Sequence, residues 1–181
     1  MNNNFSFKSY FFNIYIILFI SLLIRILFFT SYPITPISGD AGGYINMANN
    51  LIDGKGFVIQ TDYEEKEEIL YPSIRRAPLY PLIIALFNNI SSGNIDLLRW
   101  FQIFIDVITV YLIFLLGKEH FSKVVGYISS WIYALHLTFI SLPTVVLPES
   151  ILSFFSVLIV YLLLKTIDHK QKIMYTVLLG I

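Results

Sequence analysis

The sequence predicts an all-α protein: a polytopic transmembrane helical bundle with amphipathic juxtamembrane helices in one long loop. Of its 181 residues, 56% are hydrophobic and only 13% are charged, whereas soluble domains carry about 25% charged residues. The apolar positions gather into long stretches, and about 20 apolar residues cross a bilayer core of roughly 30 Å as a helix. The excess of apolar side chains is therefore assigned to lipid rather than to a protein core.

Several stretches reach the length of a membrane span within what we treat as a single membrane domain. The predicted spans are residues 10–32, 97–117, 124–142 and 144–164, with the start of another at 173–181. The first stretch lacks the small-residue cleavage site of a signal peptide, so we expect it to stay as an anchor. The last is too short to cross the hydrocarbon. We expect either that the chain is the N-terminal part of a longer protein or that this segment rests against a partner or the interface.

Basic residues in the short loops predict the orientation. Lysines gather on one set of loops, which we place in the cytoplasm together with the N-terminus, because cytoplasmic loops are enriched in Lys and Arg. These residues are Lys8, Lys118, Lys123, Lys165, Lys170 and Lys172. The loop at about 33–96 then faces outward, and its acidic cluster between Asp62 and Glu68 is expected only to stay hydrated. The predicted location is the plasma or inner membrane.

Charge and composition exclude several classes of function. The 12 basic and 12 acidic residues balance, so the chain lacks the strongly basic face that nucleic-acid binding requires. It contains no cysteine, which removes disulfides, thiolate nucleophiles and cysteine-ligated metals. The histidines, His120, His136 and His169, are too widely spaced for a compact metal motif.

The long loop is predicted to contain two short helices. Apolar residues between Tyr44 and Ile52 recur at helical spacing, with Asp40 placed to cap the start and Gly54 placed to end the helix. Such a helix would lie along the membrane surface. The apolar run 82–87 follows two prolines and is too short to span, so we expect an interfacial or re-entrant helix there.

Ionisable groups inside the predicted spans need partners or a hydrated cavity, because each costs a few kcal/mol in lipid. Arg25 and Asp106 match in depth on neighbouring spans, so they are expected either to pair or to contribute to a site. We expect His136 to be a packed, hydrogen-bonded residue rather than a ligand. Glu149 follows Pro148 at the start of a span, where the helix dipole alone would favour a carboxylate.

Three features of the long loop together favour chemistry on a lipid-linked phosphate. Asp40 lies at the start of the surface helix, and a proline-bounded segment follows later in the loop. Between them, Arg75 and Arg76 offer paired guanidinium groups that can hold phosphate bidentately. Each feature has a simpler alternative: the aspartate would also serve as a helix cap, and the arginines would also contact lipid head groups.

The order of these residues resembles a known family. The loop reads Asp40-Ala-Gly-Gly-Tyr44-Ile-Asn-Met-Ala48, then Arg76-Ala-Pro78-Leu-Tyr80-Pro81. Further matches are Leu98-Arg99, Gln102 and Asp106, Tyr133-Ala134-Leu135, and Leu147-Pro-Glu149. This pattern, from about residue 10 to 180, resembles the glycosyltransferase 39-like proteins of the GT-C class, bacterial relatives of protein O-mannosyltransferases and aminoarabinose transferases. Members are generally longer and have more spans.

The resemblance implies a membrane glycosyltransferase that moves a sugar, with inversion, from a polyprenyl-phosphate carrier to an acceptor on the outer face. Asp40 would be the catalytic residue, accepting the proton of the acceptor hydroxyl. Arg76, with Arg75 second, would bind the donor phosphate and stabilise its growing charge. The pocket would be shaped by Tyr44, Tyr80 and Glu149.

The partners implied by the resemblance are the membrane, a lipid-linked sugar donor and a glycan, lipid or protein acceptor. No cofactor is required, although a divalent cation would suit carboxylate and phosphate oxygens. Two other hypotheses stay open from the residues alone. Arg25 and Asp106 would line the pathway of a transporter or channel fragment, and a non-catalytic scaffold or inactive remnant would need neither of them.

Overall fold

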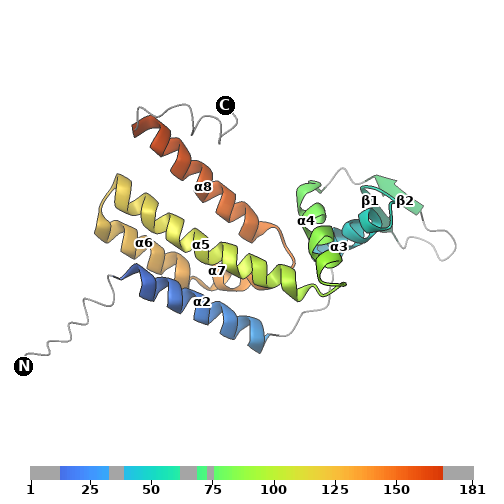
Figure 1. The fold of residues 1–181 in the computed structure, drawn as a ribbon, viewed down its shortest axis with the longest axis horizontal. Helices are drawn as coiled ribbons and strands as arrows, with labels where there is room; N and C mark the ends of the chain where they lie inside the picture. The colour runs from blue at the N-terminus through green and yellow to red at the C-terminus, as the bar shows by residue number, and fades with distance from the viewer. Residues whose placement is uncertain (1–12, 33–38, 62–68, 73–75, 169–181) are drawn as a thin grey trace, which may run out of the picture. The chain divides into compact units, whose positions relative to one another are not determined.

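Figure 1 shows the computed structural model, which describes residues 13–32, 39–61, 69–72 and 76–168. The chain forms two compact units. The membrane unit consists of Met1–Ser31, Gln102–Thr144 and Glu149–Ile181, and the loop unit consists of Tyr32–Phe101 and Val145–Pro148. Each unit is described by itself.

Apolar helices of very different lengths build the membrane unit. They are α2 (Ile14–Ser31), α5 (Asp96–His120, whose first residues belong to the loop unit), α6 (Lys123–Leu135), α7 (Leu137–Ser141), the 3-10 helix η1 (Leu142–Thr144) and α8 (Glu149–Asp168). Among the described residues, α2, α5 and the stretch Glu149–Thr166 of α8 are each long and apolar enough to cross a membrane. These helices confirm the predicted all-α transmembrane bundle.

The predicted span 124–142 is a bent pair of helices rather than one straight helix. α6 and α7 meet at an angle of 63°, and His136 between them has an extended backbone with φ −70° and ψ 122°. The break frees carbonyl groups that need donors in a membrane. Beyond the break, the Phe139 carbonyl has Pro143 as its helical i+4 partner, and proline has no N–H to donate. Pro143 therefore leaves the Phe139 carbonyl without a helical donor, in addition to the carbonyls freed at the break.

The core of the membrane unit lies where α2, α5 and α6 meet. Its buried residues are Ile17, Val110, Phe114, Tyr127, Tyr133 and Ala134. The backbones of α5 and α6 approach closely at two glycines, Gly117 and Gly126. A Cβ added to Gly117 would lie 2.7 Å from the Cα of Gly126, a distance that no real side chain tolerates. Small residues at such crossings allow helix backbones to pack directly in a membrane.

The loop unit contains two helices and a hairpin. α3 (Gly39–Ile52) and α4 (Leu79–Ile90) pack on each other, and the strands β1 (Val58–Thr61) and β2 (Ile69–Pro72) pair antiparallel. The Asn50 side chain donates to the Val58 carbonyl over 2.9 Å and ties the hairpin to α3. The sequence pattern did not indicate this hairpin, because four-residue strands are too short for a clear alternation of apolar and polar residues.

Both helices of the loop unit are short and amphipathic, as predicted. α4 buries Tyr80, Pro81 and Ile84, while its opposite side exposes an apolar stripe suited to the membrane interface. The stripe consists of Leu79, Leu82, Leu86 and Ile90. α3 ends as predicted, with Gly54 in the left-handed region at φ +75° and its N–H donating to the Leu51 carbonyl over 3.1 Å.

Candidate functional site

Asp40 and Arg76 form an ion pair in the loop unit although 36 positions separate them in the sequence. The Arg76 Nη2 donates to the Asp40 Oδ1 over 2.9 Å. The arginine side chain is only 19% exposed, whereas the aspartate side chain is 79% exposed. The cation is therefore held in place by its surroundings, and the carboxylate presents its second oxygen to solvent or a ligand.

Local structure explains why these two groups meet. Asp40 lies in the first turn of α3, and Arg76 lies just before α4, so the packing of the two helices brings their starts together. The structure corrects the prediction that Asp40 caps its helix: α3 begins at Gly39, and the carboxylate accepts from Arg76 instead. A negative charge in the first turn still interacts favourably with the helix dipole.

Gly43 provides the space in which the Arg76 guanidinium lies. A Cβ added to Gly43 would come within 2.5 Å of the Arg76 Cζ, so the guanidinium rests directly on the backbone of α3. Sequence reasoning missed this residue. A signal was present, because glycine costs about 1 kcal/mol in a helix interior, and a glycine pair inside an amphipathic helix indicates a close approach.

Two tyrosines complete the arrangement. The Arg76 Cζ lies 5.3 Å from the centroid of the Tyr44 ring, within cation–π range. Tyr44 in turn meets Tyr80 edge to face, with centroids 5.2 Å apart and an interplanar angle of 88°. Tyr80 is only 5% exposed, so it supports Tyr44 from within. We call Asp40, Gly43, Tyr44, Arg76 and Tyr80 the Asp40 cluster.

Other residues singled out in the sequence are not part of the Asp40 cluster as the structure describes it. Arg75 and the acidic cluster between Asp62 and Glu68 fall outside the described residues. Glu149 is exposed and begins α8 in the membrane unit. The prediction for His136 is wrong in part: the side chain is exposed at the α6–α7 break and contacts the Phe139 ring, with centroids 5.1 Å apart.

The pairing of Arg25 with Asp106 is confirmed. The Arg25 Nε donates to the Asp106 Oδ2 over 2.5 Å, and the Tyr133 hydroxyl donates to the Asp106 Oδ1 over 2.8 Å. The side chains of Arg25 and Asp106 are 0% and 1% exposed. Because both charges are enclosed and bonded, they brace helices rather than line a pathway. This geometry disfavours the transporter hypothesis.

Arg25 also donates hydrogen bonds to carbonyl groups on both sides of the break between α6 and α7. Its Nη1 donates to the Ala134 carbonyl over 3.3 Å, and its Nη2 donates to the Phe139 carbonyl over 3.4 Å. The second of these is the carbonyl that Pro143 cannot satisfy. The Ser21 hydroxyl accepts from Nη1 over 2.6 Å and fixes the guanidinium on α2. One side chain thus joins α2 to α5 and to both halves of the bent pair.

A family model described as dolichyl-phosphate-mannose-protein mannosyltransferase matches residues 75–181, more than half of the chain. The chain belongs to this family. It is a membrane glycosyltransferase of the mannosyltransferase type, as the resemblance to the glycosyltransferase 39-like proteins implied. No curated protein and no solved structure matches the chain. The family match includes Arg76, Tyr80 and Glu149 and begins after Asp40 and Tyr44.

Among the residues that the structure describes, no group of three or more His, Asp or Glu side chains is placed to hold a metal ion. What the Asp40 cluster offers this mannosyltransferase-type protein is one open carboxylate beside one held guanidinium. A carboxylate can accept a proton, and a guanidinium can bind phosphate through two parallel hydrogen bonds.

Proposed function

We propose that the Asp40 cluster is the transfer site at which a sugar leaves a polyprenyl-phosphate donor for an acceptor on the outer face of the membrane. Mannose is the sugar named in the description of the family. The observation that carries the proposal is the 2.9 Å contact between Asp40 and Arg76. This contact brings a carboxylate, which is able to accept a proton, beside a guanidinium, which is able to bind phosphate, near the starts of two helices.

In the proposed reaction, the acceptor oxygen attacks the anomeric carbon from the side opposite the phosphate, which inverts that carbon. The acceptor proton passes to the exposed Asp40 carboxylate. The bond between the anomeric carbon and the phosphate oxygen breaks, and its electron pair leaves with the polyprenyl phosphate. Arg76 stabilises the charge that grows on this leaving group.

The geometry of Arg76 suits a double role. Its Nη2 is engaged by Asp40, while the other nitrogens of the planar fork offer further donors to a phosphate. A guanidinium bound to both groups would fix the distance between the leaving group and the base. Orientation of this kind accounts for a large part of the barrier reduction in many enzymes. Arg75, next to it in the sequence, is proposed as the second phosphate ligand.

The apolar stripe of α4 supports a site at the lipid boundary. α4 begins three positions after Arg76 and exposes Leu79, Leu82 and Leu86. A helix with one apolar face lies in the membrane interface, and that is the depth at which a polyprenyl phosphate presents its phosphate. We propose that the loop unit faces outward, with the N-terminus in the cytoplasm, as the lysine distribution predicts.

Replacement of Asp40 by asparagine tests the site. Membranes containing the full chain are supplied with polyprenyl-phosphate mannose, and release of polyprenyl phosphate is measured. Asp40→Asn is expected to lower the rate by about 10²- to 10⁴-fold, the usual contribution of a general base. Asp53→Asn is the matched control, because Asp53 is an exposed carboxylate of the same unit whose contact is Lys55 at 3.9 Å.

Arg76 is tested by the split between binding and turnover. Arg76→Gln is expected to raise KM for the donor and to lower kcat, since the guanidinium acts on the phosphate in both the ground state and the transition state. Unchanged transfer by Asp40→Asn, at normal abundance in the membrane, would contradict the proposal. That outcome would favour the hypothesis of a scaffold without chemistry.

A further inference from the structure

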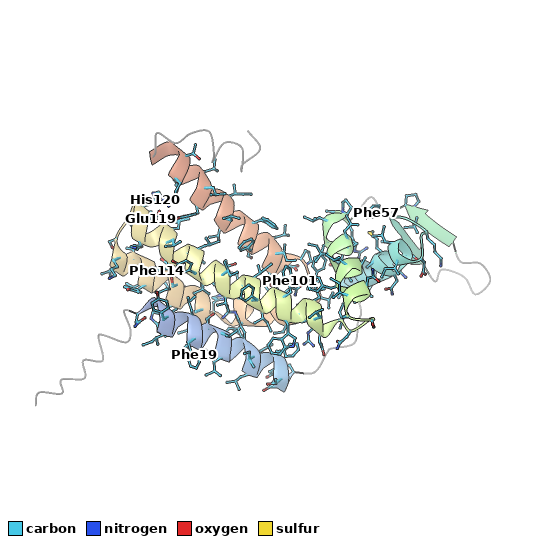
Figure 2. The ribbon with its side chains drawn as sticks, viewed as in Figure 1. Phe19, Phe57, Phe101, Phe114, Glu119 and His120 are labelled. Atoms are coloured by element: carbon cyan, nitrogen blue, oxygen red, sulfur yellow. The ribbon has the colours of Figure 1, made fainter. Side chains whose placement is uncertain are left out.

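The β1–β2 hairpin comes just before the arginine of the Asp40 cluster in the chain. α3 ends at Ile52, and the connection from there to β1 includes Phe57, which is labelled in Figure 2. β2 ends at Pro72, four positions before Arg76. Four residues span at most about 14 Å. The position of the end of β2 therefore limits where Arg76 can lie.

A hydrogen bond from α3 holds this end of the hairpin. Val58 lies opposite Pro72 in the paired strands, and proline has no N–H to donate. The Val58 carbonyl therefore receives no donor from its partner residue in β2. Its donor is the side chain of Asn50, whose Nδ2 lies 2.9 Å away. Asn50 thus supplies the bond that Pro72 cannot supply, at the end of the hairpin from which the chain continues to Arg76.

The Asn50 amide has a fixed orientation. The residue is only 3% exposed, and its Nδ2 also donates to the Asn46 Oδ1, one turn earlier on α3, over 3.2 Å. An amide nitrogen carries two N–H groups, and these two contacts use both of them. The position of β1 on α3 is therefore set by a side chain that is buried and fully bonded through its nitrogen.

The same helix carries the contact of the Arg76 guanidinium. The guanidinium rests on the backbone of α3 at Gly43, and the seven residues of helix from Gly43 to Asn50 rise about 10.5 Å. This distance is within the reach of about 14 Å that four residues have. α3 thus fixes the strand that precedes Arg76 at one place and the Arg76 side chain at another.

Without this anchor, a much longer connection would precede Arg76. Ile52 and Arg76 are 24 positions apart, whereas Pro72 and Arg76 are four positions apart. The chance of finding a chain end at a given place falls roughly as the −3/2 power of the free length, so an about sixfold longer connection lowers it about 15-fold. This factor is an upper limit, because α4 follows Arg76 and packs on α3 as well.

We infer that Asn50 is a positioning residue for Arg76. It anchors the hairpin on α3, and the anchored hairpin keeps the guanidinium against Gly43 and beside Asp40. The consequence for catalysis rests on the proposed function, in which Arg76 binds the donor phosphate. The placement of Arg76 itself does not depend on sugar transfer, so the two are tested separately.

The placement is tested by the chemical reactivity of the arginines. The full chain in detergent is treated with phenylglyoxal, which modifies guanidinium groups, and peptide mass spectrometry locates the modified residues. The Arg76 side chain is 19% exposed, so Asn50→Ala is expected to raise its modification rate severalfold, up to about 15-fold. Arg99 of the same unit is 4% exposed, and its rate should stay the same if the unit remains folded.

Asn49→Ala is the matched control. Asn49 is the exposed neighbour of Asn50 on α3, and its Oδ1 accepts from Asn88 of α4 over 3.5 Å, so its loss is expected to leave the reactivity of Arg76 unchanged. An unchanged rate at Arg76 in Asn50→Ala would overturn the inference. Equal increases at Arg76 and Arg99 would also overturn it, because Asn50 would then hold the fold of the whole unit.

Donor kinetics in membranes test the consequence for catalysis. Asn50→Ala is expected to raise KM for polyprenyl-phosphate mannose by up to about 15-fold. It should add almost nothing in the Arg76→Gln background, where no guanidinium is left to position, whereas a general loss of stability would lower transfer in both backgrounds. A raised KM in Arg76→Gln beside an unchanged KM in Asn50→Ala would overturn this role of Asn50 alone. An unchanged KM in both variants would contradict the proposed phosphate ligand, while a raised modification rate at Arg76 would still support its placement by Asn50.

Discussion

Replacing Arg25 with leucine is expected to lower the free energy of unfolding of the membrane unit by about 3–5 kcal/mol. The substitution leaves the Asp106 carboxylate buried with only the Tyr133 hydroxyl as a donor. Breaking a buried ion pair by removing one partner costs about 3–5 kcal/mol in proteins, and an aspartate at the centre of a membrane helix costs about 2.5–3.5 kcal/mol on insertion scales. The two estimates agree.

The carbonyl groups that lose their donor in Arg25→Leu lower the free energy of unfolding by a smaller amount. Arg25→Leu also removes the bonds to Ala134 and Phe139 at the break, and hydrogen bonds between membrane helices average about 0.6 kcal/mol each. Together they contribute roughly 1 kcal/mol, which moves the expected loss toward the upper end of that range. Because α6 and α7 lose their shared donor, we expect the bent pair to be the first part of the unit to open.

The measurement is equilibrium unfolding in mixed micelles, followed by tryptophan fluorescence. A double-mutant cycle isolates the pair: Arg25→Leu with Asp106→Leu removes both charges, so the double variant should be more stable than either single variant. Glu119→Gln is the control, because its pair with Lys165 is partly exposed and such pairs are worth about 0–1 kcal/mol. If the losses in unfolding free energy of the two single variants simply add in the double variant, the Arg25–Asp106 ion pair does not stabilise the helix packing.

Two glycines are expected to respond differently to the same change. Gly43→Ala should displace the Arg76 guanidinium, which is the movable end of a side chain, so sugar transfer should fall at least tenfold while the thermal unfolding midpoint changes little. Gly117→Ala drives a Cβ against the Gly126 backbone, which cannot move aside, so stability should fall by about 1–3 kcal/mol, the usual cost of overpacking. Midpoints and transfer rates of both variants, compared side by side, check the contrast; a stable Gly117→Ala or a fully active Gly43→Ala would contradict it.

The membrane helices could be predicted because their signal is local. About 20 apolar residues in a row need no knowledge of neighbours to be recognised as a span. The Arg25–Asp106 pair followed from counting depth along two such spans, since opposite charges at equal depth in lipid have few other partners. The same reasoning failed for His136, because a helix break changes the direction of the chain and brings a residue expected inside to the surface.

The Asp40 cluster could be predicted only as a set of residues. The residue types and their order, which resembles the family, pointed to Asp40, Arg76 and the two tyrosines. The 2.9 Å contact between Asp40 and Arg76 depends on how α3 packs on α4. Gly43 was missed because its role depends on having no side chain. The space that a Cβ would take is filled by the Arg76 guanidinium. Arg75, which the family resemblance ranked second to Arg76, falls outside the described residues, and its part in the site stays a prediction.

The ion pair that Arg25 of α2 forms with Asp106 has a consequence for biosynthesis. Arg25 precedes Asp106 by 81 positions, and a ribosome adds about 5–20 residues per second. The guanidinium therefore waits roughly 4–16 seconds in the insertion machinery before its counter-ion exists. During that delay the long arginine side chain can reach toward the nearer head groups, so slower translation would hold α2 without its counter-ion for longer.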